Sequence, residues 1–349
     1  MKRIFSLFLL VFVFSLFKPY VYALDESNLE SIPDNFYSES SEKGTLQEFN
    51  YDNRKCMIYL PFGYSSDTDY DIFYCMHGGY SASPNRYDQI FKTNNFSNVL
   101  DNMIEQKLIK PVIFVGLWWY PDSGPSVYAD KSIYSLLYNV ESNFSTYSKL
   151  DEYILDKDLD KEEIDKLLIN SKSHRTFGGF SNGAYCTWMI MKNDNHNYFY
   201  GFVPCSAYGY DGFDYREVFN YINNNYKEDD FIIIDSIGSF ENGNSGTPKW
   251  NLRKELYSEY EIFKEGKNYK QYLGLNRAHT VADCEHYIYQ SLIDIYGISR
   301  ENECKDEESL ESGINNLYDK DLLSKEMFFN SKLLVFPKCR LPVRKFRFF

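Results

Sequence analysis

Short apolar runs recur along the chain, and most of them lack the alternation of apolar and polar residues that marks a half-buried strand. Strands that are covered on both faces appear in a sequence as continuous apolar runs, so this pattern predicts the buried strands of a parallel sheet. The predicted strands are residues 55–60, 71–76, 111–116, 175–178, 202–207, 230–235 and 270–275.

Segments with helical spacing separate several of these runs. The predicted helices are residues 96–108, 135–147, 150–169, a run that starts at 184, and 285–295. Strands that alternate with helices predict an α/β fold with a mostly parallel central sheet and helices on both faces. In such sheets ligands bind beyond the carboxyl ends of the strands, so candidate chemistry is sought there.

The two ends of the chain depart from this pattern. Two basic residues, an apolar run and a small-residue site predict a secretory signal peptide over residues 1–23, because the run is shorter than the roughly 20 apolar residues that span a bilayer. Residues 24–50 are polar and predict a loosely attached entry segment. Residues 51–300 are expected to form the folded domain, and residues 301–349 an extension of unassigned role.

The formal net charge of −13 narrows the classes of partner. A strongly acidic surface repels phosphate backbones, which argues against nucleic-acid binding. No segment after the leader is long and apolar enough to cross a membrane, so we expect a secreted, extracellular protein without membrane attachment. Aromatic residues make up 18% of the chain, and 32 of them are tyrosines, a composition that suits clefts for planar or sugar ligands.

Seven cysteines permit disulfides in a secreted protein but leave at least one thiol unpaired within the monomer. Cys186 with Cys205 and Cys284 with Cys304 are candidate pairs. No C-x-x-C or H-E-x-x-H spacing is present, so no metal site is predicted.

The stretch Gly179-Phe180-Ser181-Asn182-Gly183 matches the G-x-S-x-G nucleophile elbow of α/β-hydrolases. A buried strand precedes it and an apolar helix follows, which is the order that the elbow requires. The competing interpretation is a glycine-rich surface turn with an ordinary serine. Ser181 is the candidate nucleophile, and the backbone N–H of Asn182 is one candidate donor to an oxyanion.

A serine nucleophile needs a histidine base and a carboxylate that orients it, and α/β-hydrolases carry them in the order serine, acid, histidine. His279 is preferred among the five histidines, and Glu241 is preferred over Asp235 because it lies in a loop beyond a strand. A second oxyanion donor is expected from Gly79 or Tyr80, in the His77-Gly78-Gly79-Tyr80 loop.

Several motifs resemble the secreted feruloyl esterases of the first carbohydrate esterase family. They occur in matching order over roughly residues 50–296 and are Tyr59-Leu60-Pro61-Phe62-Gly63-Tyr64, Met76-His77-Gly78-Gly79, residues 140–147, residues 174–181 and His286-Tyr287-Ile288-Tyr289. The resemblance implies an α/β-hydrolase esterase domain that releases ferulate esterified to arabinose on xylan, without metal or organic cofactor. Ser181, Glu241 and His279 fall on the family's nucleophile, acid and base, although the acid is commonly Asp.

The acyl pocket departs from the family, because an aromatic residue expected after Ala207 is replaced near Gly209. The aromatic residues that could substitute as a ring platform are Trp118, Trp119, Tyr208, Tyr210 and Trp250. Feruloylated or acetylated xylan is the expected substrate, with two alternatives. One is an acetyl xylan esterase or another short-acyl esterase, and the other is a catalytically silent carbohydrate-binding protein. The sequence does not predict an oligomeric state.

Overall fold

The computed structural model describes residues 29–79, 87–118, 127–130, 133–156, 159–207, 213–241 and 245–298. The chain divides into two compact units, residues 1–296 and 297–349, and every helix and strand named below belongs to the first. The expected signal peptide (1–23) and the extension (301–349) lie outside the described residues.

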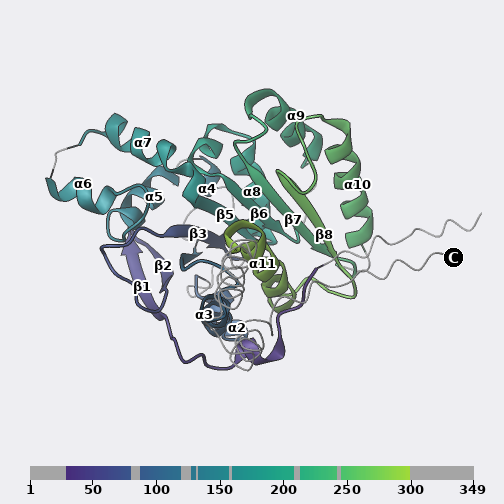
Figure 1. Cartoon of the computed structure of the whole chain (residues 1–349). Helices are drawn as coiled ribbons and strands as arrows, with labels where there is room; N and C mark the ends of the chain where they lie inside the picture. Colours follow the sequence, from purple (N-terminus) through teal and green to yellow (C-terminus); the bar gives the residue numbers. More distant parts are fainter. Residues whose placement is uncertain are drawn as a thin grey trace, which may run out of the picture. The chain divides into compact units, whose positions relative to one another are not determined.

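An eight-stranded sheet in the order β1-β2-β4-β3-β5-β6-β7-β8 forms the centre of this unit (Figure 1). Strands β3 to β8 pair in parallel, whereas β2 runs antiparallel to both β1 and β4. The mostly parallel sheet is therefore confirmed. The strands are β1 (Thr45–Tyr51), β2 (Arg54–Leu60), β3 (Asp71–Met76), β4 (Val112–Leu117), β5 (Arg175–Phe180), β6 (Gly201–Cys205), β7 (Ile232–Gly238) and β8 (Tyr269–Gly274).

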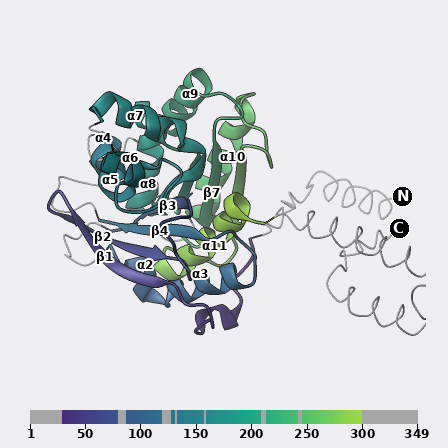
Figure 2. The ribbon, with the colours of Figure 1, turned by 60° about the vertical axis from the view of Figure 1, so that its left-hand side comes forward.

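Helices cover both faces of the sheet, as predicted (Figure 2). One face packs against η1 (Asp34–Tyr37), α2 (Gln89–Thr93), α3 (Phe96–Glu105) and α11 (Val281–Tyr296). The other face carries α4 (Val127–Asp130), α5 (Ile133–Glu141), α7 (Lys161–Asn170), α8 (Asn182–Met191), α9 (Tyr215–Asn225) and α10 (Gly246–Glu259). Adjacent strand residues point to opposite faces of the sheet. Phe73 therefore packs in the core on the face of α3 and α11, and Tyr74 packs in the core on the face of α8.

The entry segment is more ordered than its polar composition predicts. Residues 45–51 form the edge strand β1, and Ile32 and Phe36 are each only 3% exposed. A sheet edge with mostly exposed side chains leaves no apolar run in the sequence, which is why order was expected to begin only at Lys55. Backbone pairing with β2 supplies the structure instead.

Two helix predictions were wrong in their extent. Residues 150–169 form two helices, α6 (Leu150–Asp156) and α7, rather than one. Asp160 begins α7 through a reciprocal capping box with Glu163, a local signal that starts a new helix even where the apolar spacing continues. The helix predicted over residues 135–147 ends at Glu141.

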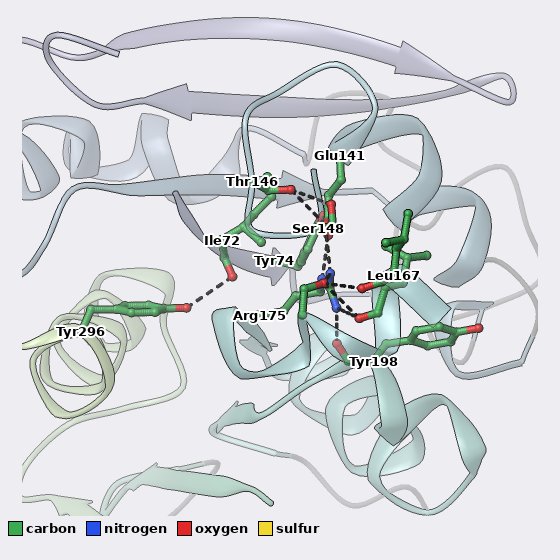
Figure 3. A network of polar contacts seen from close by, with 11 residues as sticks. Ile72, Tyr74, Glu141, Thr146, Ser148, Leu167, Arg175, Tyr198 and Tyr296 are labelled. Atoms are coloured by element: carbon green, nitrogen blue, oxygen red, sulfur yellow. Dashed lines mark hydrogen bonds and ion pairs between the residues drawn. The ribbon is translucent and has the colours of Figure 1, made fainter. Parts of the chain in front are cut away.

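A buried ion pair anchors the strand that leads to the elbow (Figure 3). Arg175, the first residue of β5, donates Nε and Nη2 to the two carboxylate oxygens of Glu141, at 2.6 and 2.9 Å. Its other N–H groups are directed to the carbonyls of Leu168 and Tyr198 and to the Ser171 hydroxyl. Both charged side chains are almost fully buried, so the strand start is fixed by a compensated charge pair.

The suggested disulfide between Cys186 and Cys205 is wrong. Cys186 belongs to the core on one face of the sheet and Cys205 to the core on the other, and neither forms a disulfide. Cys284 is a buried free thiol, and its suggested partner Cys304 lies outside the described residues. No helix in the part of the chain that the structure describes has the length and apolar character needed to cross a membrane.

Candidate active site

Ser181 stands on a sharp turn between β5 and α8, in a backbone conformation that side-chain-bearing residues seldom adopt (φ 55°, ψ −106°). The glycines on either side are needed sterically. A Cβ on Gly179 would lie 2.3 Å from the carbonyl oxygen of Met76, and one on Gly183 would lie 2.1 Å from it. The turn can approach β3 this closely only without side chains at both positions. The elbow predicted from the sequence therefore has the expected strand, turn and helix.

His279 lies between the serine and a carboxylate. Its Nε2 is 2.9 Å from Ser181 Oγ, and its Nδ1 contacts a carboxylate oxygen of Glu241. A carboxylate accepts, so the proton sits on Nδ1 and leaves Nε2 free to accept from the serine hydroxyl. Ser181 is 8% exposed and the Glu241 side chain 2%, whereas the His279 side chain is 22% exposed. In this arrangement His279 can take the proton of the serine hydroxyl.

Backbone hydrogen bonds hold the loops of the acid and the base together. Phe240 N–H donates to the carbonyl of Arg277 (3.0 Å), and Ser239 N–H donates to the carbonyl of Gly274 (2.9 Å). On the acid itself, Gly238 N–H donates to Glu241 Oε1 (3.2 Å), which leaves Oε2 for the histidine. The loop after β7 is thus fixed against the loop after β8, which sets the orientation of the imidazole.

The structure separates the two acid candidates. Asp235 is fully buried and bound by Arg253 through Nε (2.6 Å) and Nη2 (2.9 Å), with Gln271 Nε2 at 3.2 Å from the same carboxylate. Strand β7 runs on to Gly238, three residues beyond its predicted end, so Asp235 lies within the strand and Glu241 in the loop. Of the two, Glu241 is the carboxylate that contacts His279.

Two of the three candidate oxyanion donors lie next to the serine, and Tyr80 lies outside the described residues. Asn182 is the first residue of α8, where backbone N–H groups have no partner within the helix. Gly79 lies on the facing loop with φ +88°, and its carbonyl accepts a 2.9 Å hydrogen bond from Asn182 Nδ2. A Cβ on the preceding Gly78 would lie 2.6 Å from the Phe180 ring and 3.0 Å from Ser181 Cβ, so this loop packs directly on the elbow.

The two proposed ring platforms that the structure describes, Trp118 and Trp250, lie far apart. Trp118 follows β4 and is 7% exposed, whereas Trp250 is a half-buried residue of α10, with Lys254 Nζ 4.7 Å from its ring centroid. Strands β4 and β8 are five steps apart, which is roughly 24 Å at the usual strand spacing. One aromatic acyl ring cannot contact both residues. Trp119, Tyr208 and Tyr210 lie outside the described residues.

Phe180 is a feature of the site that sequence reasoning did not identify. Its ring centroid lies 4.7 Å from that of His279. Phe180 also lines a small, mostly apolar pocket beside the elbow, together with His77, Tyr87, Val281 and Ile288. The signal was its place next to Ser181 in the pentapeptide. Within the described ranges, no group of three or more His, Cys, Asp or Glu side chains is placed to hold a metal ion.

Comparison with solved structures identifies the fold. A serine-to-alanine mutant of the feruloyl esterase module from Clostridium thermocellum, complexed with sinapinate, shares 23% identity with a TM-score of 0.62, over 77% of this chain and 93% of that chain. A solved protein designated FAE shares 22% sequence identity with a TM-score of 0.66, over 77% of this chain and 94% of that chain. The chain has the α/β-hydrolase fold. A ferulic acid esterase of the anaerobic fungus Anaeromyces mucronatus shares 15% sequence identity with a TM-score of 0.53, over 76% of this chain and 95% of that chain.

Sequence comparison adds one curated relative. Over 169 residues the chain is 28% identical to endo-1,4-beta-xylanase Y of Acetivibrio thermocellus. The matched region covers 46% of this chain and 14% of that protein. The match thus spans about a seventh of the relative's length. No family model matches the chain. The α/β-hydrolase fold predicted from the sequence is confirmed, and the similar structures include feruloyl esterases, the proteins that the motifs resemble.

Proposed function

We propose that this protein is a secreted serine esterase that hydrolyses feruloyl esters on plant cell-wall xylan. One observation carries the proposal: His279 bridges a serine hydroxyl and a buried carboxylate, at an elbow where Ser181 is held at φ 55°. A glycine-rich surface turn with an ordinary serine would need neither partner.

In the proposed mechanism Ser181 Oγ attacks the ester carbonyl while His279 Nε2 takes its proton. The Glu241 carboxylate stabilises the imidazolium that forms. The N–H groups of Asn182 and of the Gly79 loop receive the oxyanion, and each such donor is typically worth about 3 kcal/mol in the transition state. His279 then protonates the departing sugar alcohol, and water activated by the same histidine hydrolyses the acyl-enzyme.

The substrate class is supported by what the similar proteins bind and do. One similar structure is a feruloyl esterase module with sinapinate, and the curated relative is a xylanase. A hydroxycinnamoyl ester on arabinoxylan contains both an acyl group like sinapinate and the xylan chain on which a xylanase acts. Cleavage of the leader over residues 1–23 would deliver the enzyme to this extracellular polymer.

Replacing the nucleophile tests the activity. Ser181→Ala should lower kcat on methyl ferulate by roughly 10⁶-fold, because no hydroxyl remains to form the acyl-enzyme. Ser206→Ala is the matched control, since Ser206 is also a buried serine with positive φ at the end of the neighbouring strand. It should keep the wild-type kcat. Wild-type activity in purified Ser181→Ala would refute the proposal.

A second measurement separates feruloyl from short-acyl specificity. Purified enzyme is incubated with arabinoxylan that carries both ester types, and released ferulate and acetate are quantified in the same reaction. Ferulate release faster than acetate release supports the proposed substrate. The reverse order would assign the same catalytic residues to an acetyl xylan esterase.

A further inference from the structure

The side chain of Asn182 joins the two sides of the site where the oxyanion would form. Its backbone N–H belongs to the first turn of α8, and its side-chain amide reaches across to the loop that follows β3, 2.9 Å from the carbonyl oxygen of Gly79. We infer that Asn182 is a positioning residue, which holds the Gly79 loop in the conformation that catalysis needs. This inference rests on the proposed esterase function.

The loop needs an external restraint because it contains two glycines in succession. Glycine visits positive and negative φ about equally, and fixing the backbone of one residue costs roughly 1–2 kcal/mol in conformational entropy. Gly79 is held at φ +88°. An oxyanion donor is effective only if it is aimed before the charge develops. A restraint on Gly79 therefore acts on the rate and not only on stability.

Side-chain hydrogen bonds to both glycine carbonyls restrain this pair. His77 Nδ1 donates to the carbonyl of Gly78 (2.8 Å), and Asn182 Nδ2 donates to the carbonyl of Gly79. A carbonyl oxygen can only accept, so the amide nitrogen of Asn182 must face the loop. The Gly79 N–H lies in the same planar peptide unit as the Gly78 carbonyl, so the bond from His77 helps to orient it. The bond from Asn182 restrains the two torsions on the other side of this N–H, at Gly79 itself.

The hydrogen bond from Asn182 to the Gly79 carbonyl has little contact with solvent on the Asn182 side. Asn182 is 3% exposed, and the loop packs so closely on Phe180 and Ser181 that a Cβ on Gly78 could not fit. The Asn182 side chain is buried and Gly79 is partly buried, so the bond is partly shielded from competition by water, and leaving the Gly79 carbonyl without its donor carries part of a desolvation penalty. The amide is thus an effective link between the helix start and the loop.

Asn182→Leu tests this role, because leucine has the same number and branching of side-chain heavy atoms and keeps the backbone N–H while it lacks the amide donor. We expect kcat on methyl ferulate to fall by about 10- to 100-fold, less than the roughly 10²–10³-fold loss of a whole oxyanion donor, with KM changed less than twofold. The inhibition constant of an arylboronic acid, which forms a tetrahedral adduct on the serine, should rise by the same factor as kcat/KM falls.

Asn193→Leu is the matched control. Asn193 lies just beyond the opposite end of the same helix, and its Nδ2 also donates to a backbone carbonyl, that of Ala129 (2.7 Å). It should lose at least as much stability, read by thermal melting, because Asn193 Oδ1 also accepts from Asn195 N–H (2.9 Å), while kcat and boronate affinity stay at wild-type values. Should Asn182→Leu fail to fold, Asn182→Asp, which keeps the shape but not the donor, replaces it.

The outcomes separate the two proposals. Wild-type kcat and boronate affinity in the Asn182 variant, or an equal loss in Asn193→Leu, would overturn the positioning role and leave the esterase proposal intact. A wild-type protein that hydrolyses no ester and binds no boronate would refute the proposed function itself. A loss of kcat and boronate affinity confined to the Asn182 variant supports the inference.

Discussion

Two carboxylates that the sequence presents as rivals have different surroundings in the folded chain. Glu241 contacts His279, whereas Asp235 is enclosed by Arg253 and Gln271. Both are almost fully buried, at 1% and 0% exposure, so burial alone does not distinguish them. The partner of each does, because an aspartate whose oxygens are both bound by an arginine is already neutralised.

Replacing each carboxylate by its amide should therefore affect different properties, kcat for Glu241 and the free energy of unfolding for Asp235. Glu241→Gln should lower kcat on methyl ferulate by roughly 10³–10⁴-fold with little loss of stability, because the amide favours the wrong histidine tautomer. Asp235→Asn should instead lower the free energy of unfolding by about 3–5 kcal/mol, because Arg253 is left as an uncompensated buried charge. Steady-state kinetics and urea unfolding on both variants check this. Near-normal rates for Glu241→Gln would assign the acid elsewhere.

At the scale of elements, α11 holds the entry segment against the domain. Ile32 N–H donates to His286 Nδ1 (3.0 Å), and Glu30 N–H donates to Gln290 Oε1 (3.1 Å). On the same helix the carboxylate of Glu285 is buried and accepts from Asn94 Nδ2 (2.8 Å). Burial, with the nearby Arg277 charge, lowers the pKa of His286 to about 4, and burial raises the pKa of Glu285 to about 7.

These two groups should affect stability in opposite directions between pH 4 and 7. His286 is neutral when folded, so its contribution is present above its unfolded pKa, near 6.5, and is lost as pH falls toward 4. Glu285 has a raised folded pKa, so its contribution is complete below pH 4.5 and is lost as pH rises through 7.

Glu285→Gln should expose the carboxyl contribution. The amide cannot ionise, so the free energy of unfolding of the variant should match the wild-type value near pH 4 and exceed it by about 3 kcal/mol at pH 8. Urea unfolding at both pH values measures the difference. His286→Asn is the opposing control, since its advantage over wild type should grow as pH falls. A difference between Glu285→Gln and wild type that did not vary with pH would contradict the assignment.

The elements themselves were predictable where apolar residues cluster. The strands β2 to β6 and β8 and the helix α8 lie where apolar runs predicted them. The two strand misses share a cause, which is that structure came from partners distant in the sequence. The edge strand β1 pairs through its backbone, and β7 extends to Gly238 along β8. Neither interaction leaves a local pattern.

Across the whole unit, the Glu141–Arg175 pair ties together segments that the sequence separates. Arg175 begins β5 at the end of the strand away from Ser181, and its guanidinium contacts α5, the end of α7 and the segment that enters β6 (Figure 3). Tyr74 and Thr146 donate to the same Glu141 carboxylate. The pair therefore acts on stability rather than on the chemistry of the elbow.

Replacing one member of the Glu141–Arg175 pair should lower the free energy of unfolding more than replacing both. Arg175→Met should lower the free energy of unfolding by about 3–5 kcal/mol, because Glu141 is left as a buried charge. The double variant Glu141→Leu with Arg175→Met should be more stable than the single variant. Both should keep the wild-type kcat per folded molecule. Urea unfolding with active-site titration tests this, and a double variant less stable than the single one would contradict it.

The sequence by itself determined most of the strands, the elbow around Ser181 and the chain order of serine, acid and histidine, because these depend on local patterns and on position along the chain. It left Glu241 and Asp235 as alternatives, and it gave the Asn182 side chain no role. The tertiary structure placed the Asn182 amide against the Gly79 carbonyl. It gave the two carboxylates different neighbours, Arg253 for Asp235 and His279 for Glu241. Those neighbours are 18 and 38 residues away along the chain and are brought close only by the sheet.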